Sequence, residues 1–292
     1  MRPTPNRFSR RSRDGAKPPS SRRRLQAVAD LRIGCSGWSY KHWKHGVFYP
    51  ERLKAADELA WYASRFDTAE INGSFYRLPA ETMVDGWLQR SPEGFLFAWK
   101  ASRFITHMKR LLDPEEPLAL MFSRTDRLGG KLGPILFQLP PAMQRNHERL
   151  AYFLSVLPPS RRYAFEFRHP SWYDETVFAQ LEQHDVALCI SDHHHAPAPW
   201  RRTASWAYVR GHGPGGRYWG RYPGATLNDW SQRILAWRRE GRDVVCYFDN
   251  DPEGAAPKDA DRLIGLTSGL PNPAPPREGG EPSSPAPDGA LA

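Results

Sequence analysis

The sequence is poor in cysteine and has no long apolar run, and both features restrict what the protein can be. Its three cysteines, Cys35, Cys189 and Cys246, lie far apart. An odd number of separated cysteines argues against a disulfide framework and a cysteine-based zinc site, so we expect buried thiols. The longest apolar stretches, such as residues 95–99, are far shorter than the roughly 20 residues that cross a bilayer. We expect no membrane segment. Because the Arg-rich start lacks the apolar core of a secretory signal, we expect a cytoplasmic protein.

The motifs of the common nucleotide-binding folds are also absent. The chain has no Walker-type phosphate loop and no GxGxxG segment after an expected strand. Its composition, 40% hydrophobic and 25% charged, is that of a globular protein and excludes collagen, coiled coils and wholesale disorder. A length of 292 residues fits one α/β barrel or two smaller domains.

Positive charge is concentrated at the N-terminal end. The formal net charge is +9, of which residues 1–24 carry +8, residues 267–292 carry −2 and the remaining body carries +3. The Arg-, Pro- and Ser-rich leader buries too little surface to offset the entropy of ordering. A nucleic-acid-binding arm and a solvated extension are its two interpretations. We predict a disordered leader, a folded domain and a disordered Pro- and Gly-rich tail, at residues 1–28, 29–268 and 269–292.

Short β-rich runs alternate with segments of helical periodicity, which is the pattern of a parallel sheet wrapped by helices. Eight strands are predicted, at residues 31–35, 67–71, 95–100, 134–139, 163–167, 186–190, 205–210 and 243–248. Seven helices are predicted, near residues 52–65, 80–90, 115–128, 145–157, 174–183, 226–240 and 257–266. The connection after the sixth strand has two prolines and no helical pattern. We predict a single-domain (β/α)8 TIM barrel of the α/β class with one degenerate βα unit after strand six.

In two of the predicted strands, aromatic residues occupy one face, and the other face ends in a charged residue. Phe97 and Trp99 alternate with Ala98 and Lys100, and strand five repeats the pattern up to Glu166. A buried charge without a partner costs much free energy. We therefore expect these charges at the carboxyl-terminal mouth of the barrel, facing each other or a ligand.

Every predicted strand ends in polar side chains, and in a TIM barrel these ends converge on one rim. The polar residues at the strand ends are Ser36, Glu70, Asn72, Lys100, Gln138, Glu166, Arg168, Asp192, Arg210, His212, Asp249 and Asn250. Aromatic residues cluster in the same loops, where flat rings suit sugars and nucleobases or pack as a lid. A ring of both charge signs predicts a polar ligand site. Ion pairs that only close the barrel are the alternative.

Lys100 is the most informative single residue. It ends an apolar strand on the inward phase, where burial would lower its pKa and make it a candidate Schiff-base nucleophile. We favour a different interpretation, in which Lys100 pairs with the carboxylate of Glu70 or Glu166 and contacts an anion.

The polar residues at the strand ends include possible metal ligands, although their spacing in the sequence matches no known metal-binding motif. The oxygen and nitrogen donors that would suit a divalent ion are Glu70, Glu166, Asp192, Asp249, His169 and His212. The histidine triplet at residues 193–195 lies in a Pro-rich loop, where adjacent side chains point in different directions. No cofactor is assigned, and a divalent metal is an alternative.

Several motifs in a fixed order resemble one known family. They are IGCSGWSY at 33–40, EIN at 70–72, FYRLP at 75–79, KASR at 100–103, ITH at 105–107, LGP at 132–134, FQLPP at 137–141, EFRHPSW at 166–172 and YFDND at 247–251. Together they resemble the family named domain of unknown function 72, the YecE-like proteins, over about residues 31–266. Where that family often reads Asn-Asn-Asp, this chain has a further carboxylate, Asp249.

The resemblance implies a TIM barrel and no established reaction. The recurrent residues of the family correspond here to Tyr40, Glu70, Asn72, Tyr76, Lys100, His107, Gln138, Glu166, Arg168, His169, Trp172, Asp192, Arg210 and Asn250.

We expect an enzyme of hydrolase or lyase type that acts on a small polar anionic ligand, such as a phosphate-bearing sugar or nucleotide. The expected catalytic residues are Glu70 and Glu166 as base and acid, with Lys100 and Asp192. The expected ligand contacts are Tyr40, Asn72, Tyr76, His107, Gln138, Arg168, His169, Trp172, Arg210 and Asn250, of which Arg168 and Arg210 hold the anion with Lys100. The alternatives are a non-catalytic module that binds nucleic acid or a nucleotide, and a scaffold with a structural ion-pair ring.

Overall fold

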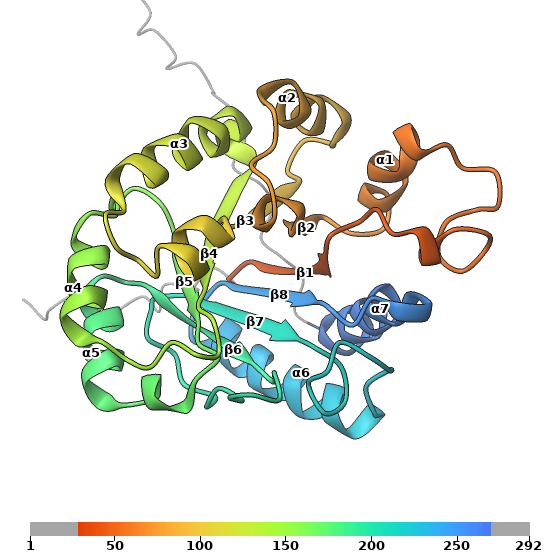
Figure 1. Cartoon of the computed structure of the whole chain (residues 1–292). Helices are drawn as coiled ribbons and strands as arrows, with labels where there is room; N and C mark the ends of the chain where they lie inside the picture. The colour runs from red at the N-terminus through yellow and green to blue at the C-terminus, as the bar shows by residue number, and fades with distance from the viewer. Residues whose placement is uncertain (1–28, 270–292) are drawn as a thin grey trace, which may run out of the picture.

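The structure is a closed barrel of eight parallel strands. A computed structural model describes residues 29–269, so the predicted leader and nearly all of the predicted tail lie outside the described residues. The strands pair in chain order and β8 pairs with β1, which closes the barrel (Figure 1). Their bounds are β1 Leu31–Ser36, β2 Thr68–Ile71, β3 Leu96–Lys100, β4 Leu132–Gln138, β5 Tyr163–Glu166, β6 Ala187–Ser191, β7 Ala207–Gly211 and β8 Val244–Phe248.

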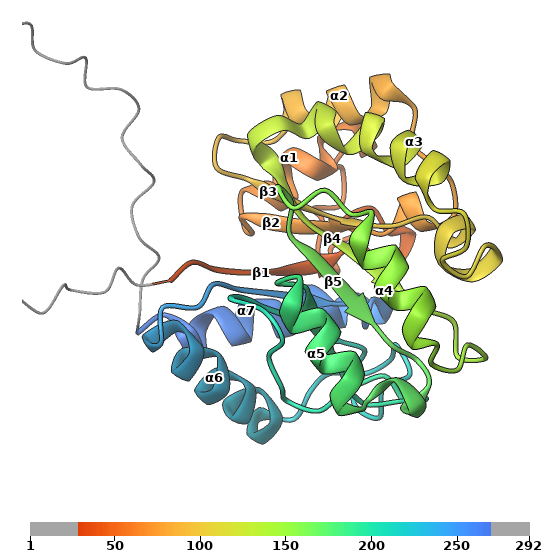
Figure 2. The same ribbon diagram turned by 90° about the vertical axis from the view of Figure 1, so that its left-hand side faces the viewer.

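Helices surround the strands in both ribbon views (Figure 2). They are α1 Glu58–Ala63, α2 Glu81–Arg90, α3 Glu115–Thr125, α4 His147–Ser155, α5 Glu175–Gln183, α6 Gly224–Arg239 and α7 Ala255–Thr267. In the described chain, β6 leads to β7 with no helix between them, which confirms the degenerate unit and the predicted TIM barrel. None of the helices described is both long enough and apolar enough to cross a membrane.

The alternation of side chains along the strands separates two apolar layers. The outward residues Phe97, Phe137 and Phe165 belong to the large core beneath the helices, where the Phe137 ring lies 5.0 Å from that of Phe153 on α4. The inward residues form a second cluster, made of Ala98, Leu136, Ala164, Ala187, Cys189, Trp206, Tyr208, Val245 and Tyr247. The predicted strand phase is therefore confirmed. All three cysteines are free and buried, as expected.

The barrel closes tightly where β1 passes β2. A Cβ atom on Gly34 would lie 2.2 Å from the backbone oxygen of Thr68 and 2.8 Å from the hydroxyl of Tyr62. Backbone atoms of a barrel strand cannot move aside alone, so only glycine fits at this position.

We predict that Gly34→Ala destabilises the fold by at least about 2 kcal/mol, because overpacking at a rigid site costs roughly 1–3 kcal/mol. Gly265→Ala in α7 is the matched control, since a methyl group at that position would meet no atom within 4 Å. That change replaces a helical glycine and is expected to stabilise by up to about 1 kcal/mol. Urea unfolding of both variants measures the two effects. Equal stability of the two variants would contradict the close approach.

Candidate active site at the barrel mouth

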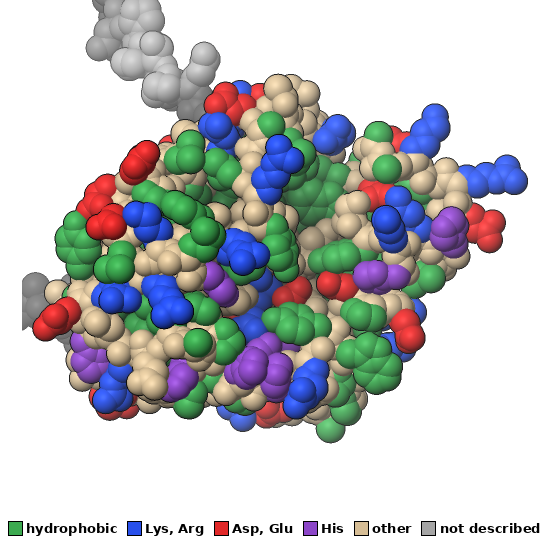
Figure 3. Space-filling view, in the orientation of Figure 1, with side chains coloured by type: hydrophobic (Ala, Val, Ile, Leu, Met, Phe, Trp, Pro, Cys, Tyr) green, Lys and Arg blue, Asp and Glu red, His purple; other side chains and the backbone are tan. Residues whose placement is uncertain are grey.

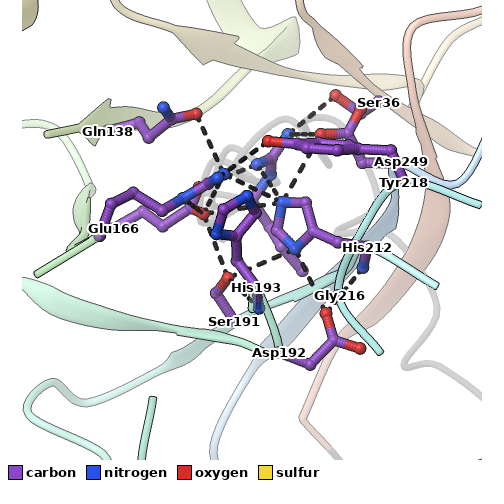
Figure 4. Close-up of polar contacts among 12 residues, drawn as sticks. Ser36, Gln138, Glu166, Ser191, Asp192, His193, His212, Gly216, Tyr218 and Asp249 are labelled. Atoms are coloured by element: carbon purple, nitrogen blue, oxygen red, sulfur yellow. Dashed lines mark hydrogen bonds and ion pairs between the residues drawn. The ribbon is translucent and has the colours of Figure 1, made fainter. Parts of the chain in front are cut away.

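Arg210 occupies the centre of the carboxyl-terminal end of the barrel. It lies on β7 and is fully buried. Its guanidinium donates to Glu70 at 2.7 and 3.1 Å, to Glu166 at 2.8 Å and to Asp249 at 2.8 Å. It also donates to the Ser36 hydroxyl at 3.0 Å. One side chain thereby joins residues of β1, β2 and β5 and the residue after β8. Figure 4 shows three of these partners, Ser36, Glu166 and Asp249, gathered at the mouth.

The carboxylates of Glu70 and Glu166 are saturated with donors. Glu70 accepts from Ser36 and, at 2.6 Å, from the Tyr208 hydroxyl, in addition to Arg210. Glu166 accepts from the Arg168 guanidinium at 2.5 Å and from the Ser191 hydroxyl at 3.1 Å. Both carboxylates are completely buried. We call these side chains, together with Arg210, His212 and Asp249, the polar cluster.

His212 is held as a neutral ring between the two arginines. Its Nε2 lies 3.0 Å from Arg210 and 3.1 Å from Arg168, and a guanidinium can only donate. Nε2 therefore accepts, and the ring proton is on Nδ1, which faces Asp192 Oδ1 at 3.3 Å. Burial and the two guanidinium charges hold the pKa of His212 well below its usual range.

The predicted acid and base roles of Glu70 and Glu166 do not fit this environment. Burial alone would raise the pKa of Glu166, but the charges of Arg168 and Arg210 outweigh it and place that pKa well below the usual range. The same balance, with Arg210 and Lys100 opposing burial, lowers the pKa of Glu70. A general acid at neutral pH needs a raised pKa. We therefore assign both carboxylates to the ion-pair network.

The predicted anion contact of Arg210 is also excluded by its donors. An arginine has five N–H groups, and Arg210 directs them at two glutamates, an aspartate, a serine and a histidine. Arg168 uses four of its five, on Glu166, Tyr218, Gln138 and His212, and so keeps one N–H for a ligand.

Lys100 does not form the ion pair that the sequence led us to favour. Among the residues described, no carboxylate oxygen lies within 4.0 Å of its ammonium group. Its Nζ donates to Asn72 Oδ1 at 3.1 Å and lies 4.7 Å from the centre of the Phe75 ring. The reason is that Arg210 already holds the carboxylates. Burial, reinforced by the Arg210 charge, lowers the pKa of Lys100 to about 8.

Two acidic residues after β8, Asp249 and Asp251, have raised pKa values, in contrast to Glu70 and Glu166. Burial raises the pKa of Asp249, although Arg210 opposes the shift. Burial and the nearby Asp249 raise the pKa of Asp251 to about 8, and the Tyr40 hydroxyl interacts with its carboxyl group. Asp251 Oδ1 is buried without a hydrogen-bond partner. Asp251, with its raised pKa and unpartnered oxygen, is therefore the residue of the two that is suited to donate a proton.

Asp192 lies at the edge of the polar cluster and has a mainly structural role. Its Oδ1 accepts from the His212 backbone N–H at 2.8 Å, and its other oxygen accepts from the Tyr222 hydroxyl. Burial raises the pKa of Asp192 to about 6 despite these hydrogen bonds.

Four of the predicted ligand contacts lie around Lys100 and Arg168. Asn72 holds the ammonium group, and Tyr76 is the most exposed of the four, at 69%. The His107 ring packs 5.0 Å from Phe75, and burial with the Lys100 charge lowers the pKa of His107 to about 4. Gln138 Oε1 accepts from Arg168 at 3.3 Å.

Three predicted contacts are not part of this arrangement. His169 caps the turn that follows β5, where its Nδ1 accepts from the Ser171 backbone N–H at 3.2 Å. Trp172 is fully buried and stacks on Phe167 at 4.8 Å. Asn250 is also buried, and its amide donates to Gly220 and Asp259. All three hold the scaffold of the mouth in place.

Tyr218 is the clearest functional-site residue that the sequence reasoning missed. Its hydroxyl accepts from Arg168 at 2.8 Å, and Figure 4 shows its ring beside His212. It lies in the glycine-rich loop after β7, residues 212–220, where its own φ is +65°. An aromatic ring in a glycine-rich loop at the end of a strand was the signal in the sequence that could have identified it. Tyr208 was recognisable from its inward phase, two residues before Arg210.

No metal site is formed by the residues described, in which no group of three His, Cys, Asp or Glu side chains is arranged to hold an ion. Of the carboxylates that we considered as ligands, Glu70, Glu166 and Asp249 are bound by Arg210, and Asp192 accepts from His212 and Tyr222. The rings of His193, His194 and His195 lie 4.2 to 5.1 Å apart and are tilted against one another.

A large cavity opens beside the polar cluster. It has a volume of about 950 Å³ and lies between the segment that precedes α1 and helix α2. It reaches the mouth at Tyr40 and Asn72, which line it. Figure 3 shows a hollow in this face, with side chains of both charges at its floor and histidines at its rim. The cavity thus borders the mouth at Tyr40 and Asn72.

Fold and site together define a TIM-barrel protein with a buried charge network at the carboxyl ends of its strands. The family model described as protein of unknown function DUF72 matches residues 32–279, and the chain belongs to this family. It is 27% identical to the UPF0759 protein YunF of Bacillus subtilis (strain 168), over 81% of this chain and 94% of that protein.

Two solved structures of the same family share the fold. One, from Thermotoga maritima MSB8, is 25% identical with a TM-score of 0.74 and covers 82% of this chain and 99% of its own. The other, from Enterococcus faecalis V583, is 21% identical with a TM-score of 0.68, over 82% of this chain and 95% of its own. The family expected from the motifs is therefore confirmed.

We predict that Arg210→Met destabilises the protein by about 3–5 kcal/mol, because it leaves buried carboxylates without their partner. Arg233→Met is the control, since Arg233 forms an exposed pair with Asp229 on α6 and should change stability by no more than about 0.5 kcal/mol. Denaturant unfolding at neutral pH compares them. A loss below about 1 kcal/mol for Arg210→Met would refute the central role of this residue.

Proposed function

We propose that the protein is a cytoplasmic enzyme of lyase type in which the Lys100 amine reacts with the carbonyl group of a small polar anionic ligand. The observation that carries the proposal is the position of Lys100. The residue is only 5% exposed at the mouth, borders a cavity through Asn72 and has no ion-pair partner among the described residues. Buried lysines with lowered pKa values are the usual amine nucleophiles.

The proposed step balances within the site. The neutral Lys100 amine attacks the carbonyl carbon and forms a C–N bond, while the C=O electron pair moves to oxygen. That oxygen takes a proton from the Asp251 carboxyl group, whose Oδ1 is buried without a hydrogen-bond partner. The carbinolamine then loses water to give a protonated imine, which accepts the electron pair of an adjacent bond as that bond breaks. The enamine left by that cleavage takes a proton from solvent water at its carbon atom and becomes a protonated imine. Water hydrolyses this imine, which releases the carbonyl product and restores the amine.

Cationic and polar donors at the mouth support an anionic ligand. The neutral Lys100 amine keeps one N–H group after its bond to Asn72, Arg168 keeps one, and the amide nitrogen of Gln138 has no hydrogen-bond partner within the part of the chain that is described. Three free thiols suit a reducing compartment, which is consistent with the cytoplasm.

Nucleic-acid binding is less well supported by the folded domain. Most of the positive charge that suggested it belongs to residues 1–24, which lie outside the described residues. The arginines at the mouth are engaged with carboxylates, whereas phosphate binding needs free cations.

Reductive trapping with pyridoxal phosphate, an anionic aldehyde, tests the proposal. Borohydride reduction and peptide mass spectrometry should identify Lys100 as the main modified residue at pH 7. Because the neutral amine reacts, labelling should rise with pH and level off above a midpoint near 8. A labelling midpoint of Lys100 at the ordinary lysine value of about 10.4 would contradict the lowered pKa.

The controls distinguish loss of the Lys100 amine from loss of its positive charge and from unfolding of the protein. Lys100→Arg keeps the positive charge and should lose the label, while the exposed Lys258→Met should keep it. Circular dichroism verifies that each variant is folded. Label confined to exposed lysines, with Lys100 unmodified in the folded protein, would overturn the proposal.

A further inference from the structure

We propose that the cavity between the segment before α1 and helix α2 is a binding subsite for the aromatic or apolar part of an anionic ligand. This inference rests on the proposed function for the position of the reacting end of that ligand. The cavity volume of about 950 Å³ is at the upper end of small-molecule pockets, which span roughly 300–1,000 Å³. A small carbonyl compound alone would leave most of it empty.

The walls of the cavity are apolar and aromatic. They are formed by Trp38, Leu59, Ile71, Leu78, Met83 and Trp87. The rings of Trp38 and Trp87 meet edge to face, with centroids 5.5 Å apart and planes at 89°, and both are only partly buried. Such an open aromatic corner is suited to a flat ring, since aromatic pairs prefer offset or edge contacts. In Figure 3 the cleft to the right of centre shows these hydrophobic walls.

The charges around the cavity favour an anion. The carboxylate of Glu58 is buried and engaged by Lys44 at 2.8 Å and by Ser39 at 2.6 Å. Arg124 is paired with Glu81 at 2.7 Å. The two other charged lining residues, Arg77 and Arg90, are exposed and have no ion pair with any residue that the structure describes. A ligand with a carboxylate, sulfonate or phosphate on its apolar part would neutralise them.

The cavity borders the reactive end of the site through two residues. Tyr40 and Asn72 line it, and Asn72 Oδ1 accepts the hydrogen bond from Lys100 Nζ at 3.1 Å. A ligand seated between Trp38 and Trp87 can therefore extend past Asn72 toward the amine. The substrate class that follows is a carbonyl compound with an aromatic or bulky apolar group that carries an anionic substituent.

Binding of two dyes tests the cavity without any chemistry at Lys100. The probes are 8-anilinonaphthalene-1-sulfonate and its neutral analogue N-phenyl-1-naphthylamine. We expect the double change Arg77→Gln and Arg90→Gln to weaken binding of the sulfonate about tenfold, which corresponds to about 1.4 kcal/mol, and binding of the neutral dye less than about twofold. Arg239→Gln, an exposed arginine on α6, is the matched control and should change neither.

Filling the cavity from two sides tests its shape. Met83→Trp on α2 and Ala56→Trp on the opposite wall should each weaken both dyes about tenfold or more. Two separate variants are used so that one altered local fold does not decide the result. Unchanged binding of both dyes to both variants, each folded by circular dichroism, would overturn the inference.

Two aldehydes link the cavity to Lys100. The probes are 6-formyl-2-naphthoate, which carries the aromatic acid, and glyoxylate, which lacks it. Trapping at Lys100 should be about tenfold faster with the naphthoate, and Met83→Trp should remove this advantage while leaving glyoxylate unchanged. Equal rates in the unchanged protein would overturn the subsite and leave the Lys100 proposal standing. Trapping of neither aldehyde at Lys100 would overturn the proposed function, and the dye results then decide the cavity alone.

Discussion

The buried guanidinium of Arg210 is the contact on which the mouth of this barrel depends. From β7 it reaches Ser36 on β1, Glu70 on β2, Glu166 on β5 and Asp249 after β8. A buried ion network of this kind does not by itself make a protein more stable than a well-packed apolar core. Its effect here is geometric, because strands distant in sequence are held in one arrangement by a single side chain.

The same network divides the charged residues of the mouth into two groups. Glu70 and Glu166 are ionised and fully hydrogen-bonded, so they are suited to structure and poorly suited to proton transfer. Lys100 is left without a carboxylate, and Asp251 is left with an unpartnered oxygen. Groups with pKa values near neutrality are the ones that can exchange protons during turnover. Arg210 therefore determines which residues are available for chemistry, although it does not contact the ligand.

Strand alternation explains how much of this could be predicted. The inward phase of β3, β5 and β7 placed Lys100, Glu166 and Arg210 at one mouth, and the degenerate unit after β6 followed from two prolines. The same alternation could have excluded Asn250, because its neighbour Asp249 points inward. Trp172 was included for its family motif, although it lies in a turn that packs outside the barrel.

The pairing of the charges could not be predicted, because it depends on three-dimensional competition. From the sequence, Glu70 and Glu166 were both plausible partners for Lys100. Only the structure shows that Arg210 binds both carboxylates and that Lys100 binds Asn72 instead. Tyr218 reaches Arg168 through the backbone turn of a glycine-rich loop, whose path no periodicity encodes. The cavity likewise depends on residues far apart in the sequence, from Gly37 to Arg124, that only the fold brings together.

The ionisation of the Lys100 amine is the property on which the functional account most directly depends. It can be followed by nuclear magnetic resonance of the protein carrying ¹³C at the lysine ε-carbon, with Lys100→Arg used to assign the signal. The account predicts that this signal titrates with a midpoint near pH 8, well separated from the exposed lysines. A midpoint at the ordinary lysine value of about 10.4 would contradict it.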